Sequence, residues 1–170
     1  MKKTMIVIML VIVLFALVGC DYIYSIADNL GMNIAPSSLK TEQTFKGGKT
    51  SIKFSSNPIA MFDITPTFDY ATLAKYKFES VKITVTYTIY YAKDSVFSGV
   101  PEYSVSIMGD DLMGWEERDL KASKSRETRT FEKTTSLGKF QQHSWKLMFS
   151  TDTLIGTIYI ENISVTIKCV

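Results

Sequence analysis

One polar and aromatic stretch, residues 109–119, has the composition of a ligand-binding loop. Trp115 lies in it among the carboxylates of Asp110 and Asp111 and the guanidinium of Arg118. An indole can stack on the apolar face of a sugar ring, while carboxylates and guanidinium groups hydrogen-bond its hydroxyls. We therefore expect a ligand site at these residues. The alternative is that Trp115 folds back over the end of a hydrophobic core.

Residues suited to catalysis are sparse. His143 is the only histidine, which excludes a histidine-based metal cluster and leaves a catalytic triad no choice of base. Acidic pairs occur at residues 110–111 and 116–117, but neighbouring residues of an extended chain point apart. A glycosidase would need two such carboxylates to converge at a defined separation. The sequence predicts a protein without enzymatic activity, metal ion or cofactor.

The N-terminus has the pattern of a processing signal. Lys2 and Lys3 precede an uninterrupted apolar run from Met5 to Gly19. A basic start, an apolar stretch of this length and a small residue before the cleavage point are typical of a secretory signal peptide. The run is shorter than the roughly 20 apolar residues that a membrane-spanning helix usually needs. We predict a signal peptide over residues 1–19.

Residues 17–20, Leu-Val-Gly-Cys, resemble the lipobox of bacterial lipoproteins. The resemblance implies cleavage between Gly19 and Cys20 and attachment of lipid to the Cys20 thiol. Several acyl chains on one residue hold a protein firmly on a membrane. An uncleaved anchor and a signal cut elsewhere are the alternatives, and both also place the rest of the chain outside the cytoplasm. We expect an extracytoplasmic protein that is lipid-anchored to the bacterial cell membrane.

Removing residues 1–19 changes the charge balance. It takes away two of the 19 basic side chains and none of the 17 acidic ones, so that 17 of each remain. A neutral chain argues against a nucleic-acid partner, because such binding depends on a large positive field. Cys169 is then the remaining unmodified thiol, which excludes an intramolecular disulfide.

From residue 49 onward, apolar residues alternate with a period of two, which predicts β-strands with one face on a core. The predicted strands cover residues 52–54, 81–91, 103–107, 145–149 and 163–169, with a Thr- and Arg-rich edge strand at 125–135. The alternation changes phase at Glu161–Asn162, which predicts one strand bent by a β-bulge or two strands joined at a corner. The later row places Cys169 among the buried residues. Residues 70–76 predict a single helical turn.

These segments predict an all-β protein, an antiparallel two-sheet sandwich of about seven to nine strands. No stretch has the long helical period that the crossovers of a parallel sheet require. Residues 20–48 show no sustained period. We expect them to form a lipid-anchored N-terminus and tether, which leaves residues 49–170 as the sandwich domain.

The strand order after residue 78 and the closing sequence around Glu161–Asn162 resemble jelly-roll carbohydrate-binding modules and galactose-binding-like domains. The resemblance implies a jelly-roll sandwich with a glycan as its first ligand class. Glu161 stands where several of those modules have an aspartate that contributes to a calcium site. The sequence thus predicts a membrane-anchored lipoprotein with a non-catalytic glycan-binding module. The alternative is an envelope lipoprotein that docks a protein partner through a sheet edge or face.

Overall fold

The computed structural model describes residues 35–53, 56–92, 100–110, 114–152 and 156–170. The predicted signal peptide, the lipobox with Gly19 and Cys20, and Asp111 lie outside these residues. No helix among the described residues is long and apolar enough to cross a membrane. The described residues fall into two units, one that contains Phe68–Phe78 and one that contains Glu42–Thr67 and Glu79–Val170.

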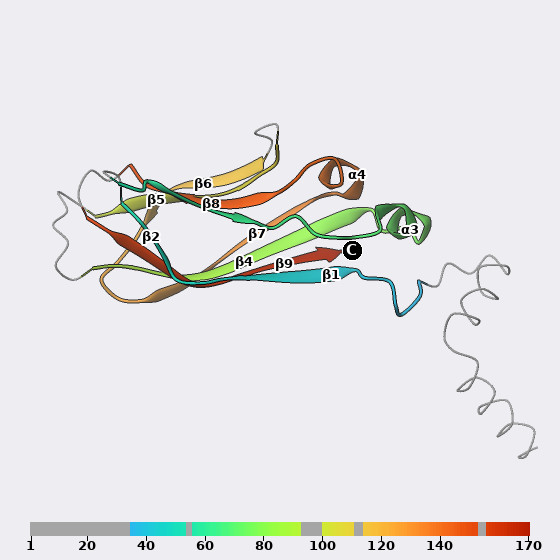
Figure 1. The fold of residues 1–170 in the computed structure, drawn as a ribbon, viewed down its shortest axis with the longest axis horizontal. Helices are drawn as coiled ribbons and strands as arrows, with labels where there is room; N and C mark the ends of the chain where they lie inside the picture. Colours follow the sequence, from blue (N-terminus) through green and yellow to red (C-terminus); the bar gives the residue numbers. More distant parts are fainter. Residues whose placement is uncertain (1–34, 54–55, 93–99, 111–113, 153–155) are drawn as a thin grey trace, which may run out of the picture. The chain divides into compact units, whose positions relative to one another are not determined.

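The second unit is an antiparallel sandwich of two sheets, which confirms the predicted fold class (Figure 1). One sheet has the order β1-β9-β4-β7, with the short β2 also paired to β9, and the other has the order β3-β8-β5-β6. With β2 left aside, the strand order is that of a jelly roll. The strands are β1 (Glu42–Gly47), β2 (Thr50–Ile52), β3 (Ile59–Asp63), β4 (Ser80–Tyr91), β5 (Glu102–Met108), β6 (Gly114–Lys121), β7 (Glu127–Ser136), β8 (Lys146–Ser150) and β9 (Ile158–Cys169).

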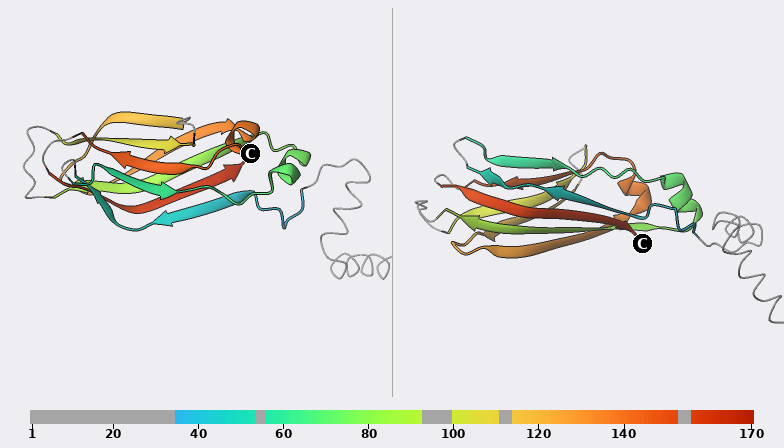
Figure 2. Two further views of the ribbon diagram at one scale, coloured as in Figure 1. Left: turned by 45° about the horizontal axis from the view of Figure 1, so that its top comes forward. Right: turned by 60° about the horizontal axis from the view of Figure 1, so that its bottom comes forward.

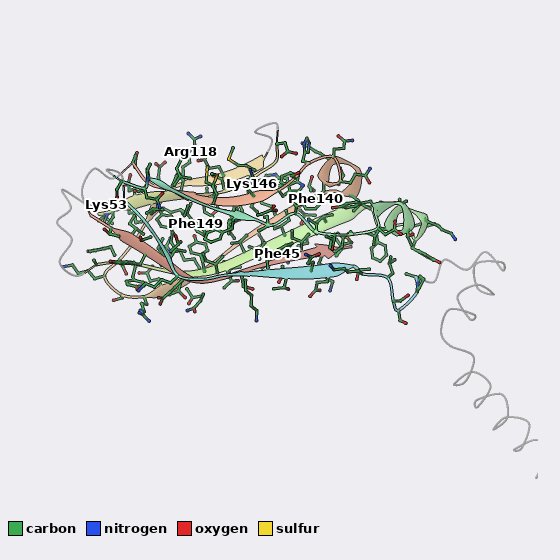
Figure 3. All side chains as sticks on the ribbon, in the orientation of Figure 1. Phe45, Lys53, Arg118, Phe140, Lys146 and Phe149 are labelled. Atoms are coloured by element: carbon green, nitrogen blue, oxygen red, sulfur yellow. The ribbon has the colours of Figure 1, made fainter. Side chains whose placement is uncertain are left out.

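The two sheets form the two layers seen in Figure 2, and the core lies between them and comes from the alternating rows. On β4 the row from Val81 to Ile89 is at most 2% exposed. Tyr87 of this row meets the opposite sheet, where its ring packs edge-on against Phe149 at 5.0 Å and its hydroxyl hydrogen-bonds the Tyr103 hydroxyl at 3.0 Å. Figure 3 shows Phe149 between the layers. Burial raises the pKa of both tyrosines, so the hydroxyl pair stays neutral.

The end of the chain is one bulged strand. Asn162 has a φ of 54°, and the pairing of β9 with β4 shifts register opposite Thr86–Thr88. Of the two predicted alternatives, the structure has the single strand bent by a bulge. Beyond it Cys169 is 2% exposed. Burial raises the pKa of its thiol to about 11, which keeps the thiol protonated at neutral pH.

The sandwich begins earlier than predicted. β1 pairs with β9 from Glu42 to Gly47, inside the stretch that was expected to be tether, so the boundary at residue 49 is wrong. β1 is an edge strand whose half-buried row contains Gln43, Phe45 and Gly47. With one large apolar residue in that row, no alternation is visible in the sequence. Sheet pairing, rather than a repeated apolar pattern, defines this strand.

Two short helices complete the described chain. In the first unit, α3 (Tyr70–Lys75) confirms the predicted helical turn, and the Asp69 carboxylate caps it by accepting hydrogen bonds from the Thr72 amide and hydroxyl. In the sandwich unit, α4 (Leu137–Phe140) was not predicted. It follows β7, which is an edge strand as expected. Four residues are too few to show a helical period.

Candidate functional site

The predicted ligand-binding loop is in part a strand. Residues Gly114–Lys121 form β6, an edge strand that pairs with β5. Trp115 lies opposite Ile107, whose side chain is buried in the core, whereas Glu116 lies opposite Ser106 on the outer face. The interpretation as a loop was wrong because charged residues occupy most positions of this edge strand. Edge strands often use such charges against sheet-to-sheet association, and the charges hide the alternation.

Trp115 packs on the end of the core. Its ring is half-buried and stacks on Trp145, with 5.4 Å between the centroids and 14° between the planes. Trp145 also stacks on Phe140 at 4.8 Å, and the His143 ring meets Trp145 edge-on at 5.7 Å. Trp115 also lines a hollow on the outer face of the second sheet. Trp115 therefore contacts the core, as the alternative interpretation expected, and also lies beside a hollow in which a ligand could bind.

Of the other predicted residues that the structure describes, Arg118 lines the same hollow as Trp115, and Asp110 lines a neighbouring one. Asp110 is exposed, and its Oδ2 accepts a hydrogen bond from the Ser144 amide at 2.9 Å. This bond ties the end of β5 to the residue before Trp145. Arg118 points away from the sandwich (Figure 3), and its Nε donates to the Glu116 carboxylate. The structure thus spreads the described members of the predicted site along one sheet.

A groove crosses the outer face of the β3-β8-β5-β6 sheet. It consists of three neighbouring hollows of about 320, 290 and 280 Å³. The first two share Met108 and Met148, and the last two share Glu116 and Arg118. We call this surface the outer groove. Its central residues are Met61, Met108, Met148, Ser106, Glu116 and Arg118.

The floor of the outer groove contains a buried hydroxyl. Ser106 is 2% exposed, and its Oγ has no hydrogen-bond partner among the residues that the structure describes. Strand register places Ser106 between Met148 and Glu116, both on the outer face. A buried polar atom without a partner costs about 1–3 kcal/mol, and such atoms are rare in native proteins. The hydroxyl is therefore a candidate contact for a ligand in the groove.

Sequence reasoning missed this groove, although one signal was present. Ser104 and Ser106 alternate with the apolar core residues of β5, and Met148 occupies the same outward row on β8. Small polar residues and methionine on an outward row mark a face that is neither strongly charged nor closed by large side chains. Strand order decides which outward rows become neighbours. Since the sequence alone does not reveal that order, these rows could not be predicted to form one surface.

A second polar cluster contains Tyr90 of β4 and Glu161 of β9. Tyr90 stacks on Tyr159 at 5.3 Å, and the cations of Lys49 and Arg126 lie over its ring at 5.8 and 4.8 Å. Glu161 binds Arg126 at 3.0 Å and accepts from the Tyr90 hydroxyl at 3.4 Å. The side chain at the position of the calcium-site aspartate therefore has an arginine partner. No three His, Cys, Asp or Glu residues gather as a metal-binding group in the described ranges.

Similarity to known proteins is found among solved structures. Neither a family profile nor a curated protein sequence matches the chain. Among solved structures, infectious bursal disease virus Gt strain matches 78% of this chain and 34% of its own, with 10% identity and a TM-score of 0.45. This chain thus spans about a third of that one. The Stig cyclase Fisc from Fischerella sp. TAU matches 65% of this chain and 55% of its own, at 13% identity and a TM-score of 0.45.

A further structure, described as "CBM4 structure and function", matches 82% of this chain and 81% of its own. The identity is 11% and the TM-score is 0.43.

Proposed function

We propose that this chain is an extracytoplasmic lipoprotein, anchored through lipid on Cys20, whose sandwich binds a glycan in the outer groove without catalysis. The observation that supports ligand binding is the unpartnered Ser106 hydroxyl on the groove floor. Methionine side chains beside it offer an apolar surface to the C–H face of a sugar. Glu116 and Arg118 offer an acceptor and a donor for sugar hydroxyls.

The experiment is a glycan-array screen of the purified chain, followed by titration of the best glycan. Ser106→Ala is expected to weaken binding about tenfold, which is the loss of roughly 1.4 kcal/mol from one hydrogen bond. Because Ser106→Ala also removes an unpaired buried hydroxyl, the free energy of unfolding should not fall. Thr130→Ala, an exposed residue on the opposite sheet, is the matched control and should bind like wild type.

Equal glycan affinity in Ser106→Ala and wild type would contradict a site at the groove floor.

Absence of glycan binding would favour a second candidate, docking of an envelope protein. One observation supports that candidate: β3 is the other edge of the same sheet, where Ile59 and Met61 are 43% and 62% exposed. Exposed apolar residues on an unpaired edge are suited to pairing with another chain.

The lipid anchor has its own test. Cells that express the chain are labelled with radioactive palmitate, and we expect label on wild type and none on Cys20→Ala. The reason is that the thiol of the lipobox cysteine is the expected attachment point. Equal labelling of both proteins would disprove attachment at Cys20.

A further inference from the structure

All methionines of the described ranges line one hollow. Met61, Met108 and Met148 surround the first part of the outer groove, about 320 Å³ in volume. None of them belongs to the buried core between the sheets, which is built from aliphatic and aromatic side chains. Met61 is 62% exposed, so its side chain adds little to the hydrophobic stabilisation of the fold. Hydrophobic packing in the core therefore does not account for the shared location of the three methionines, which directs attention to the chemistry of their thioether sulfur atoms.

Strand register places Met61 and Met108 on either side of Met148. Met61 on β3 is the direct partner of Met148 on β8. Met148 in turn pairs with Ser106 on β5, and Met108 follows two residues later on the same face. Direct partners on one face have Cβ atoms about 4.5–5.5 Å apart, and diagonal neighbours lie at about 7–8 Å. Unbranched methionine side chains span such separations, since each has three rotatable side-chain bonds.

Thioether sulfur is a soft, neutral ligand. Soft ligands select Cu(I) among the first-row metals, whereas Mg²⁺, Ca²⁺ and Mn²⁺ prefer oxygen. Three neutral ligands do not offset a metal charge, so a monovalent ion is less costly to desolvate here than a divalent one. The charged groups at this hollow are Lys146 and Asp110, and Asp63 lies beside Lys146 in the next row. Lys146 therefore has neighbouring carboxylates that offset its positive charge.

We infer that Met61, Met108 and Met148 form a thioether site for a soft monovalent cation, Cu(I), on the outer face of the β3-β8-β5-β6 sheet. The site occupies the part of the outer groove that lies toward β3, whereas Glu116 and Arg118 line the part toward β6. Binding involves coordination alone, without a redox step. Met108 and Met148 line both this part and the neighbouring hollow that contains Ser106, so the variant that separates copper binding from glycan binding is Ser106→Ala, which leaves all three methionines in place.

The test is competition for Cu(I) between the full chain in detergent and bicinchoninate, with ascorbate keeping the copper reduced. Wild type is expected to withdraw one equivalent more than the variant in which Met61, Met108 and Met148 are all leucine. Each single Met→Leu change should lower the affinity at least tenfold. Such swaps conserve volume and usually cost less than about 1.5 kcal/mol of stability, so the variants should fold. Ile59→Leu is the matched control at a neighbouring exposed position and should bind like wild type.

Both cysteines remain in every variant, so copper held by thiols does not affect the difference. A second readout titrates Ag(I) into the chain with ¹³C-labelled methionine methyl groups. The three resonances assigned by the single variants should shift together and saturate at one equivalent. Equal Cu(I) uptake by wild type and the triple variant would overturn the proposal, as would Zn²⁺ binding with the same dependence on methionine. Ser106→Ala should retain copper, which separates this test from that of glycan binding.

Discussion

Trp145→Ala is expected to lower the free energy of unfolding by about 3–5 kcal/mol, the usual cost of truncating a large buried aromatic residue. The side chain is 1% exposed and stacks on the rings of Phe140 and Trp115. Its Nε1 also donates to the Phe140 carbonyl at 2.8 Å. Truncation removes both stacking contacts and leaves that carbonyl without this donor. Since marginal stability is about 5–15 kcal/mol, the change removes a large share of the total.

Urea denaturation followed by far-ultraviolet circular dichroism measures this loss. Trp145→Phe should cost less, because it keeps a ring in the stack and loses the indole donor. Trp115→Ala serves as the comparison from the same stack: Trp115 is half-buried, so its truncation should cost less than that of Trp145. A loss below about 1 kcal/mol for Trp145→Ala would show that the stack contributes little to stability.

The alternation of apolar residues in the sequence was enough to predict the inner strands of the sheets, but it left some edge strands undetected. Long alternating rows on β4 and β9 are visible because both strands lie inside a sheet and bury a full apolar row. A bulge or a corner in β9 was predicted for the same reason, since an extra residue shifts a regular row. β1 and β6 were missed because edge strands bury fewer large apolar side chains. Recognition of a strand thus depended on how much of its face is buried.

The candidate site was harder to predict because it depends on pairing between strands. Trp115 and Arg118 are three residues apart, yet β6 directs Trp115 toward the core and Arg118 outward. Conversely, Met61 and Met148 are far apart in sequence and become direct partners. Register defines such neighbours, and a single sequence contains the alternation of each strand but not its partner. Residue types alone therefore pointed to one sheet, and the pairing of its strands added Met61, Ser106 and Met148 to the candidate site.

Gly114→Ala is expected to separate the start of β6 from β5 and to lower the free energy of unfolding by about 2–3 kcal/mol, within the range for forced overpacking. A Cβ at this position would lie 1.9 Å from the Ile107 carbonyl oxygen and 2.9 Å from its carbonyl carbon. These are backbone atoms of the paired strand, so no side-chain rotation can relieve the contact. The strand must move instead, and Glu116 and Arg118 move with it, so ligand binding in the outer groove should weaken as well.

Gly138→Ala is the matched control. Gly138 lies in α4, is exposed, and a Cβ there would meet nothing within 4 Å. Alanine favours a helical backbone over glycine by roughly 0.5–1 kcal/mol, so this variant should be as stable as wild type or slightly more stable. Thermal unfolding of both variants, with hydrogen exchange at the β5 and β6 amides, measures the difference. Because glycine flexibility is lost in both variants, only the steric contact with Ile107 distinguishes them. If Gly114→Ala matched Gly138→Ala in stability and in protection of β6, close approach of β5 and β6 could not be the reason for glycine at position 114.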